Sequence, residues 1–290
     1  MKKNYFNDKF FIIISIFLLS ISFYFSISTL THIFDSGHHG SILLYGLDII
    51  NGKVPYKEIF LQYGLLNPVI NSIFLRIFNY DIIGIYIATS IYYCLGILFL
   101  SLKAKNLTNK NFLLLTILII LLNHPIPEYP WPNYTAFFFM AFGIYLFNEK
   151  NNKNLFLSNF FLSLACLSRE NFYYFIIPSI LFINLLLFLK YKKININIYS
   201  LSGFIFPIII FFTYLIFNDI FLKWIEFQKL PFEYLQSYDK NLFQLLNEFF
   251  EFFIFNIPFL IGISPEYFLI LFVLLFNLYV LVEEVLVKKI

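Results

Sequence analysis

Two short segments of the chain carry side chains that could perform acid–base and anion-binding chemistry. Residues 34–40 read FDSGHHG, and the carboxylate of Asp35 could accept a proton from a hydroxyl group. Residues 167–171 read LSREN and contain Arg169, one of only two arginines in the chain. An arginine stays charged in poorly hydrated surroundings, and its planar fork matches phosphate oxygens. An enzyme that transfers a group from a phosphate-linked donor to a hydroxyl group requires both a base and a phosphate-binding cation.

The composition places these segments in a membrane protein. Of the 290 residues, 60% are hydrophobic and only 13% are charged, whereas soluble domains are about half apolar and about a quarter charged. The net charge of +3 is small and scattered along the chain, which predicts no nucleic-acid partner. The two cysteines, Cys94 and Cys166, lie in apolar runs and indicate neither a disulfide framework nor a metal site.

The apolar segments predict an all-α, polytopic transmembrane bundle of about eight spans, with residues 1–290 forming a single membrane domain. A span needs about 20 apolar residues to cross a hydrocarbon core of about 30 Å. The candidates lie roughly at 10–31, 82–102, 111–124, 134–148, 155–168, 171–189, 196–217 and 267–286. The first one continues without a cleavage site, so we interpret it as a retained span and not as a signal peptide.

Lysine placement predicts the orientation of the bundle, because positively charged loops stay on the cytoplasmic side of a membrane. Lysines gather before the first span, after the second, fourth and sixth spans, and at the end of the chain. We therefore expect both termini in the cytoplasm. The candidate residues Asp35 and Arg169 and all four histidines then lie on the extracytoplasmic side, where we expect the function. In the alternative interpretation, the lysines of short connectors only set the topology and say nothing about function.

The extracytoplasmic segment 32–81 predicts two helices that lie along the membrane surface. Apolar residues from Ile42 to Ile50 recur at helical spacing, which is typical of an amphipathic helix. The sequence NGK at 51–53 predicts a turn that ends this helix, since glycine tolerates positive φ. A second apolar run follows and reaches Phe78. Two such helices would cover a pocket at the level of the membrane surface.

This segment resembles the first extracytoplasmic loop of the GT-C class of membrane glycosyltransferases, which includes the protein O-mannosyltransferases and the bacterial aminoarabinose transferase group. The similar features are the acidic residue with Gly and His after the first span, GKVPYKE at 52–58 and QYGLL at 62–66. Weaker similarity continues in YPWPNY at 129–134 and in LSREN. The resemblance implies a polyprenyl-phosphate sugar donor, a catalytic carboxylate in this loop and a location in the bacterial plasma (inner) membrane. The chain departs from the family in having one carboxylate, Asp35, where a pair is common, and in its shorter C-terminal region.

For such a transfer we expect Asp35 to be the general base, because partial burial at a membrane surface raises the pKa of a carboxyl group. The alternative is that Asp35 only caps the following helix, since Asp is a favoured N-cap residue. We expect Arg169 to bind the donor phosphate, with Lys53 and Lys57 as auxiliaries. The alternative for Arg169 is a salt bridge to Glu128 or Asp35, because an unpaired arginine between two spans is costly.

The remaining candidates would bind substrate, and they are His38, His39, Glu128, Tyr63, Trp131 and Glu170. Trp131 could equally anchor the chain at the membrane surface. Imidazole and carboxylate groups could ligate Zn²⁺ or Mn²⁺, but neighbouring His38 and His39 point about 100° apart on a helix and match no metal motif. We therefore expect no metal or other cofactor. The expected partners are the polyprenyl-phosphate sugar, the lipid bilayer and an acceptor that the sequence does not identify.

Two other functions are compatible with the same sequence. A transporter or flippase of lipid-linked sugars would place polar or charged residues deep inside its spans, and the predicted spans are almost uncharged. An inactive, truncated relative that acts as a membrane scaffold would retain only the fold. The substitution Asp35→Asn would distinguish transfer from transport, because only transfer needs a base.

Overall fold

The computed structural model describes residues 5–32, 37–61, 63–107, 127, 129–192 and 194–227. In this part of the chain the secondary structure is helical, apart from an isolated bridge between Pro55 and Ile59. The chain divides into two compact units, Met1–Asn218 and Asp219–Ile290. The described part of the second unit is short and contains a helical segment at 221–227. Asp35, Glu128 and the predicted spans at 111–124 and 267–286 lie outside the described residues.

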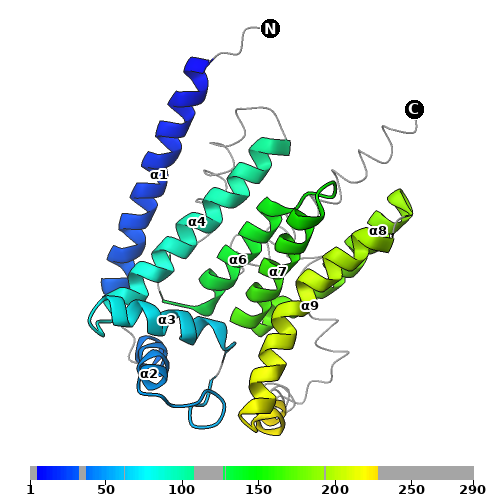
Figure 1. Ribbon diagram of the computed structural model, residues 1–290. Helices are drawn as coiled ribbons and strands as arrows, with labels where there is room; N and C mark the ends of the chain where they lie inside the picture. The colour runs from blue at the N-terminus through cyan, green and yellow to red at the C-terminus, as the bar shows by residue number, and fades with distance from the viewer. Residues whose placement is uncertain are drawn as a thin grey trace, which may run out of the picture. The chain divides into compact units, whose positions relative to one another are not determined.

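Long apolar helices dominate the first unit (Figure 1). They are α1 (Tyr5–His32), α4 (Ile83–Leu107), α6 (Pro132–Leu146), α7 (Asn152–Ser168), α8 (Tyr173–Tyr191) and α9 (Ile194–Phe217). Among the described residues, four segments are long and apolar enough to cross a membrane: Ser15–His32, Ile83–Lys103, Glu170–Tyr191 and Asn197–Phe217. They correspond to four of the predicted spans and indicate a membrane protein. Helices α6 and α7, with 15 and 17 residues, are shorter than the roughly 20 residues of an ordinary span.

The helices of the first unit pack in the order α1, α4, α6, α7 and α9, each on the next. Small and polar residues allow this close packing, as is usual when helices associate inside lipid. A Cβ atom on Gly143 of α6 would lie 2.8 Å from the carbonyl oxygen of Ser158 on α7. The hydroxyl groups of Ser26 and Ser90 lie 2.7 Å apart and join α1 to α4. A small residue and a hydroxyl pair thus lie at two of the helix contacts of the bundle.

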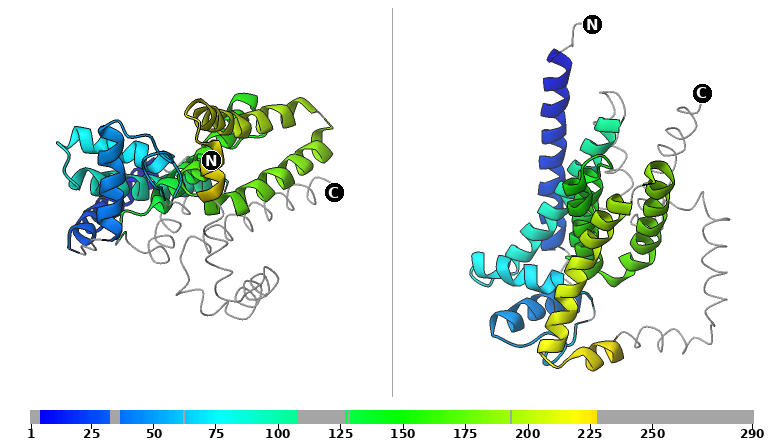
Figure 2. Two further views of the ribbon diagram at one scale, coloured as in Figure 1. Left: turned by 90° about the horizontal axis from the view of Figure 1, so that it is seen from below. Right: turned by 45° about the vertical axis from the view of Figure 1, so that its right-hand side comes forward.

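Two lysines, Lys103 and Lys190, contact the connection between α6 and α7 at one end of this bundle. Near the end of α4, the Lys103 ammonium donates to the carbonyl oxygen of Phe147, just beyond α6. Lys190, in the last turn of α8, forms an ion pair of 2.8 Å with Glu149 in the connection between α6 and α7. Figures 1 and 2 show α2 (His38–Ile50) and α3 (Leu66–Ile77) at the other end, where α1 terminates.

The two helices predicted in segment 32–81 are present as α2 and α3, which pack on each other. Their contact is apolar and is centred on Ile42, Leu75 and Ile85, the last from α4. Helix α2 ends at Ile50, and Gly52 in the following turn has φ +84°, which confirms the predicted turn. The N-cap residue of α2 is Gly37. Asp35 lies outside the described residues, so both roles considered for it, base and helix cap, stay predictions.

The loop that joins α2 to α3 folds back onto the long helices. Tyr56 is 1% exposed, and its backbone N–H donates to the carbonyl oxygen of Ile59. The Tyr214 hydroxyl of α9 donates to the carbonyl oxygen of Pro55 over 3.2 Å. At the start of the loop, Lys53 forms an ion pair with Asp48 of α2. These contacts hold the loop in place beside the ends of α7 and α9.

Candidate functional site

Three segments that are distant in the sequence meet at the α2 and α3 end of the bundle. They are the loop residues Tyr63 and Gly64, the extended residues 129–131 before α6, and the turn at Arg169 between α7 and η1 (Glu170–Phe172). Gly64 is buried directly against the end of α7, since a Cβ atom there would lie 2.9 Å from the carbonyl carbon of Ser168 and would overlap the Leu167 carbonyl group. Only glycine fits this position without displacing the backbone.

Arg169 is the central cation of this site. Its backbone is extended, with φ −150° and ψ +116°, and its N–H donates to the carbonyl oxygen of Ala165 to cap α7. The guanidinium carbon lies 4.3 Å from the ring centroid of Tyr63 and 5.9 Å from that of Trp131. Its Nη1 atom is buried and has no hydrogen-bond partner among the described residues. The side chain is therefore positioned by stacking on aromatic rings, while part of its hydrogen-bonding capacity is unused.

An aromatic cluster surrounds the guanidinium group. The ring of Trp131 lies 4.8 Å from that of His38, 5.6 Å from that of Tyr63 and 6.2 Å from that of Tyr129. His39 points elsewhere and is fully buried between Tyr86 and Tyr129, with ring centroids 5.5 Å from each. His38 is exposed. His38 can therefore reach a ligand directly, whereas His39 supports the ring of Tyr129 from within the fold.

Glu170 faces the loop instead of the aromatic cluster. Its carboxyl group accepts hydrogen bonds from the backbone N–H groups of Gly64 and of Glu170 itself, and it lies within electrostatic reach of Arg169. Burial, and then the negative charge of Glu170, raise the pKa of Tyr56 well above its usual range. The Tyr56 hydroxyl thus stays protonated and neutral beside the carboxyl group. This arrangement gives Glu170 a positioning role, because it fastens the loop that carries Tyr63 to the turn that carries Arg169.

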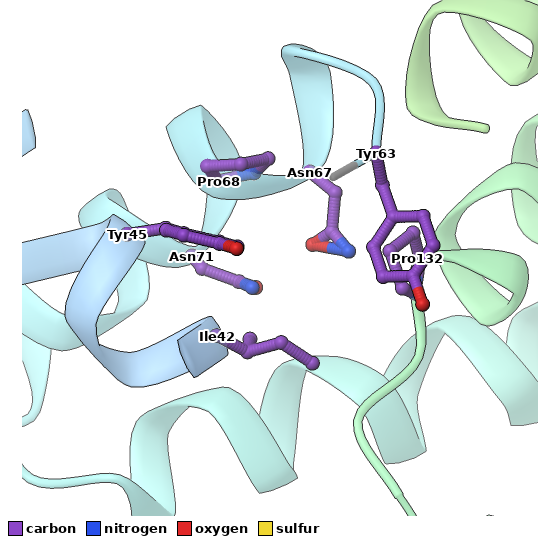
Figure 3. Close-up of a pocket in the computed structure, with 7 residues that line it drawn as sticks. All are labelled: Ile42, Tyr45, Tyr63, Asn67, Pro68, Asn71 and Pro132. Carbon is purple, nitrogen blue, oxygen red and sulfur yellow. The ribbon is translucent and has the colours of Figure 1, made fainter. Parts of the chain in front are cut away.

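A small pocket opens beside Tyr63, with about 240 Å³ of empty space including its open side. It is lined by Ile42, Tyr45, Tyr63, Asn67, Pro68, Asn71 and Pro132. Figure 3 shows the side-chain amides of Asn67 and Asn71 pointing into this space from α3, with Tyr63 and Pro132 on the opposite side. Tyr63 therefore both lines the pocket and carries Arg169 stacked on its ring.

The structure brings together most of the predicted site residues that it describes. Arg169 lies over the rings of Tyr63 and Trp131, and Trp131 in turn contacts Tyr63 and His38. Glu170 holds the surrounding backbone. The auxiliary lysines are placed differently. Lys53 is engaged by Asp48, and both Lys53 and Lys57 are exposed. Asp35 and Glu128 fall outside the described residues, so their predicted roles stay predictions.

The described residues contain no group of three or more His, Cys, Asp or Glu side chains that could hold a metal ion. His38 and His39 diverge, as adjacent positions on a helix do. His38 contacts Trp131, and His39 contacts Tyr86. The described site contains a cation, a carboxyl group, amides and aromatic rings.

Sequence reasoning missed three contributors to this site, namely Gly64, Asn67 and Asn71. Gly64 lies within the QYGLL motif, but the sequence contains no sign of its contact with Leu167 and Ser168, more than one hundred residues away. The asparagines offered a usable signal. They are four residues apart in the same helix, and that spacing places both on one face.

Gly64→Ala should destabilise the protein by about 1–3 kcal/mol, because the added methyl group overlaps the end of α7. Thermal unfolding of the detergent-purified chain, followed by circular dichroism, measures this effect as a lower Tm. The control is Gly40→Ala in α2, where an added Cβ meets no atom within 4 Å and the better helix propensity should stabilise by about 0.5–1 kcal/mol. Equal Tm values for Gly64→Ala and the wild type would show that the loop does not press against α7.

Comparison of the chain with protein-family models, with curated proteins and with solved structures finds no match in any of the three. Function is therefore inferred from the residues and contacts of this site.

Proposed function

We propose that the chain is an integral membrane glycosyltransferase that moves a sugar from a polyprenyl-phosphate donor to an acceptor at the extracytoplasmic face. In this reaction an acceptor hydroxyl attacks the anomeric carbon while Asp35 takes its proton. The bond between the anomeric carbon and the phosphate oxygen breaks, and the polyprenyl phosphate leaves with the bonding electron pair. Arg169 binds that phosphate as its negative charge increases, which is the kind of stabilisation that lowers a transfer barrier.

The observation that carries this proposal is the incomplete coordination of Arg169. A guanidinium group has five N–H donors, and leaving buried donors unpaired costs about 1–3 kcal/mol or more for a charged group. The Nη1 atom of Arg169 is buried and has no partner in the described part of the chain. The ring of Tyr63 covers one face of the guanidinium group. The positions open to a ligand therefore lie along the edge of the guanidinium group, where its N–H donors point. An oxyanion at that edge would form bidentate hydrogen bonds, which phosphate geometry favours.

The position of Arg169 along the chain favours the phosphate of a lipid. It directly precedes Glu170–Tyr191, a segment long and apolar enough to cross a membrane. A residue at the end of such a span lies near the level of lipid headgroups, and the prenyl tail of a donor can then stay among the lipid chains. An arginine at this level is costly unless it has an ionic partner or a ligand.

The aromatic cluster supports a sugar as the transferred group. The ring centroids of His38 and Tyr63 lie 4.8 Å and 5.6 Å from that of Trp131. Aromatic faces attract the C–H groups of a sugar ring, and the polar edges of Tyr, Trp and His can bind its hydroxyl groups. Asp35 is separated from His38 by only two residues in the sequence, which keeps the proposed base close to this cluster.

The proposal is tested with membranes that contain the chain, a set of labelled undecaprenyl-phosphate sugars and a cell-envelope extract as the source of acceptors. We expect label to appear in a glycan, lipid or protein of the extract, together with one free undecaprenyl phosphate for each sugar transferred. Membranes without the chain serve as the control. Intact donor moved across the membrane without cleavage would instead establish a transporter, and the proposal would be wrong.

A further inference from the structure

The pocket beside Tyr63 contains two asparagine amide groups that form no hydrogen bond with the described residues. Asn67 and Asn71 are each 3% exposed. Within the described residues no hydrogen bond reaches either side-chain amide. Other buried asparagines of the chain are used structurally, since Asn159 donates to the carbonyl oxygen of Leu155 and Asn184 donates to Ser200. The amides of the pocket thus differ from these in having no hydrogen-bond partner in the described part of the chain.

The lining of the pocket restricts the chemistry of its ligand. No charged side chain is among the described residues that line it, so an ionic group would lack a counter-charge there. Two amide oxygens are too few for a Ca²⁺ or Mg²⁺ ion, which take about six or more oxygen ligands. An apolar group would leave both amides unpaired. A hydroxyl group fits best, because it donates to an amide oxygen and accepts from an amide N–H.

Tyr63 connects the pocket to the proposed phosphate site. Its ring lines the pocket and also lies 4.3 Å from the guanidinium carbon of Arg169. A ligand whose phosphate binds Arg169 can therefore place an adjoining group across Tyr63 and into the pocket. The pocket is small, and it admits the hydroxyl-bearing edge of a ring more readily than a whole sugar.

We infer that Asn67 and Asn71 form a hydroxyl-recognition subsite that selects the sugar of the donor, an inference that rests on the proposed function. One amide at each helical turn of α3 contacts neighbouring hydroxyl groups of the sugar, while Tyr63 and Pro132 border its apolar face. The subsite is neutral and sets specificity, whereas Arg169 binds the phosphate that all donors share.

The test uses the full-length chain in lipid nanodiscs and measures dissociation constants for undecaprenyl phosphate and for its glucose, mannose, galactose, N-acetylglucosamine and arabinose derivatives. The wild type should bind at least one glycosylated lipid about tenfold more tightly than undecaprenyl phosphate. Asn67→Leu and Asn71→Leu keep the number and branching of the side-chain heavy atoms and remove the amide, and each should reduce that preference by about tenfold. Binding of undecaprenyl phosphate should stay unchanged in both variants, which also shows that they are folded.

Asn159→Leu is the matched control, because it removes an equally buried amide from α7 that does not line the pocket. It should retain the preference for the glycosylated lipid. The inference is wrong if the wild type shows no preference for any of the five sugars, or if both pocket variants retain it. Failure of the wild type to bind any of these phosphate lipids would instead overturn the proposed function, so the two failures are distinguishable.

Discussion

Arg169→Gln should reduce sugar transfer by about 10²–10³-fold, because it removes the charge and the donor fork that bind the leaving phosphate. The substitution keeps a side chain that can still cover Tyr63, so the protein should insert and unfold as the wild type does. Arg169→Lys restores the charge without the planar fork or the stacking on Tyr63, and it should recover only part of the activity. Initial rates of transfer from the preferred undecaprenyl-phosphate sugar measure both effects.

The chain contains one matched control for this experiment. Arg76 is the other arginine, and it lies exposed in the last turn of α3. Arg76→Gln makes the same change of charge in the same unit, outside the aromatic cluster. It should leave the rate of transfer nearly unchanged. Comparable losses in Arg76→Gln and Arg169→Gln would mean that net charge matters and that Arg169 has no specific role.

Asp35→Asn should lower the rate of transfer by about 10²–10⁴-fold while leaving the affinity for the donor unchanged, because it removes the base and not the phosphate site. Separate measurements of donor binding and of single-turnover transfer distinguish the two effects. The control is Asp48→Asn in α2, whose carboxylate forms a partly exposed ion pair with Lys53 that contributes little to stability. Wild-type transfer rates in Asp35→Asn would show that another group is the base.

The sequence predicted local structure well in the segment before α4. Helix α2 and the turn at Gly52 followed from helical spacing and from the backbone freedom of glycine, which depend on neighbouring residues only. Arg169 was correctly expected in a short polar break between apolar helices. The ion pair of Lys53 with Asp48 was not predicted, because it depends on how the chain turns back after α2.

The assembly of the site could not be predicted from such local patterns. Tyr63 and Arg169 are more than one hundred residues apart, and their stacking depends on the packing of Gly64 against the end of α7. No periodicity encodes a contact of that kind. Asn67 and Asn71 were overlooked for a different reason, since asparagine is frequent throughout this chain and its amide becomes informative only when it is buried without a partner.

The central claim is that Arg169 binds the phosphate of a polyprenyl lipid. Its most direct test compares the binding of undecaprenyl phosphate with that of undecaprenol, which has the same chain and no phosphate, by wild-type and Arg169→Gln protein in nanodiscs. The wild type should bind the phosphate about tenfold or more tightly, and Arg169→Gln should bind the two lipids equally. A wild type without this preference, or a variant that retains it, would contradict the claim.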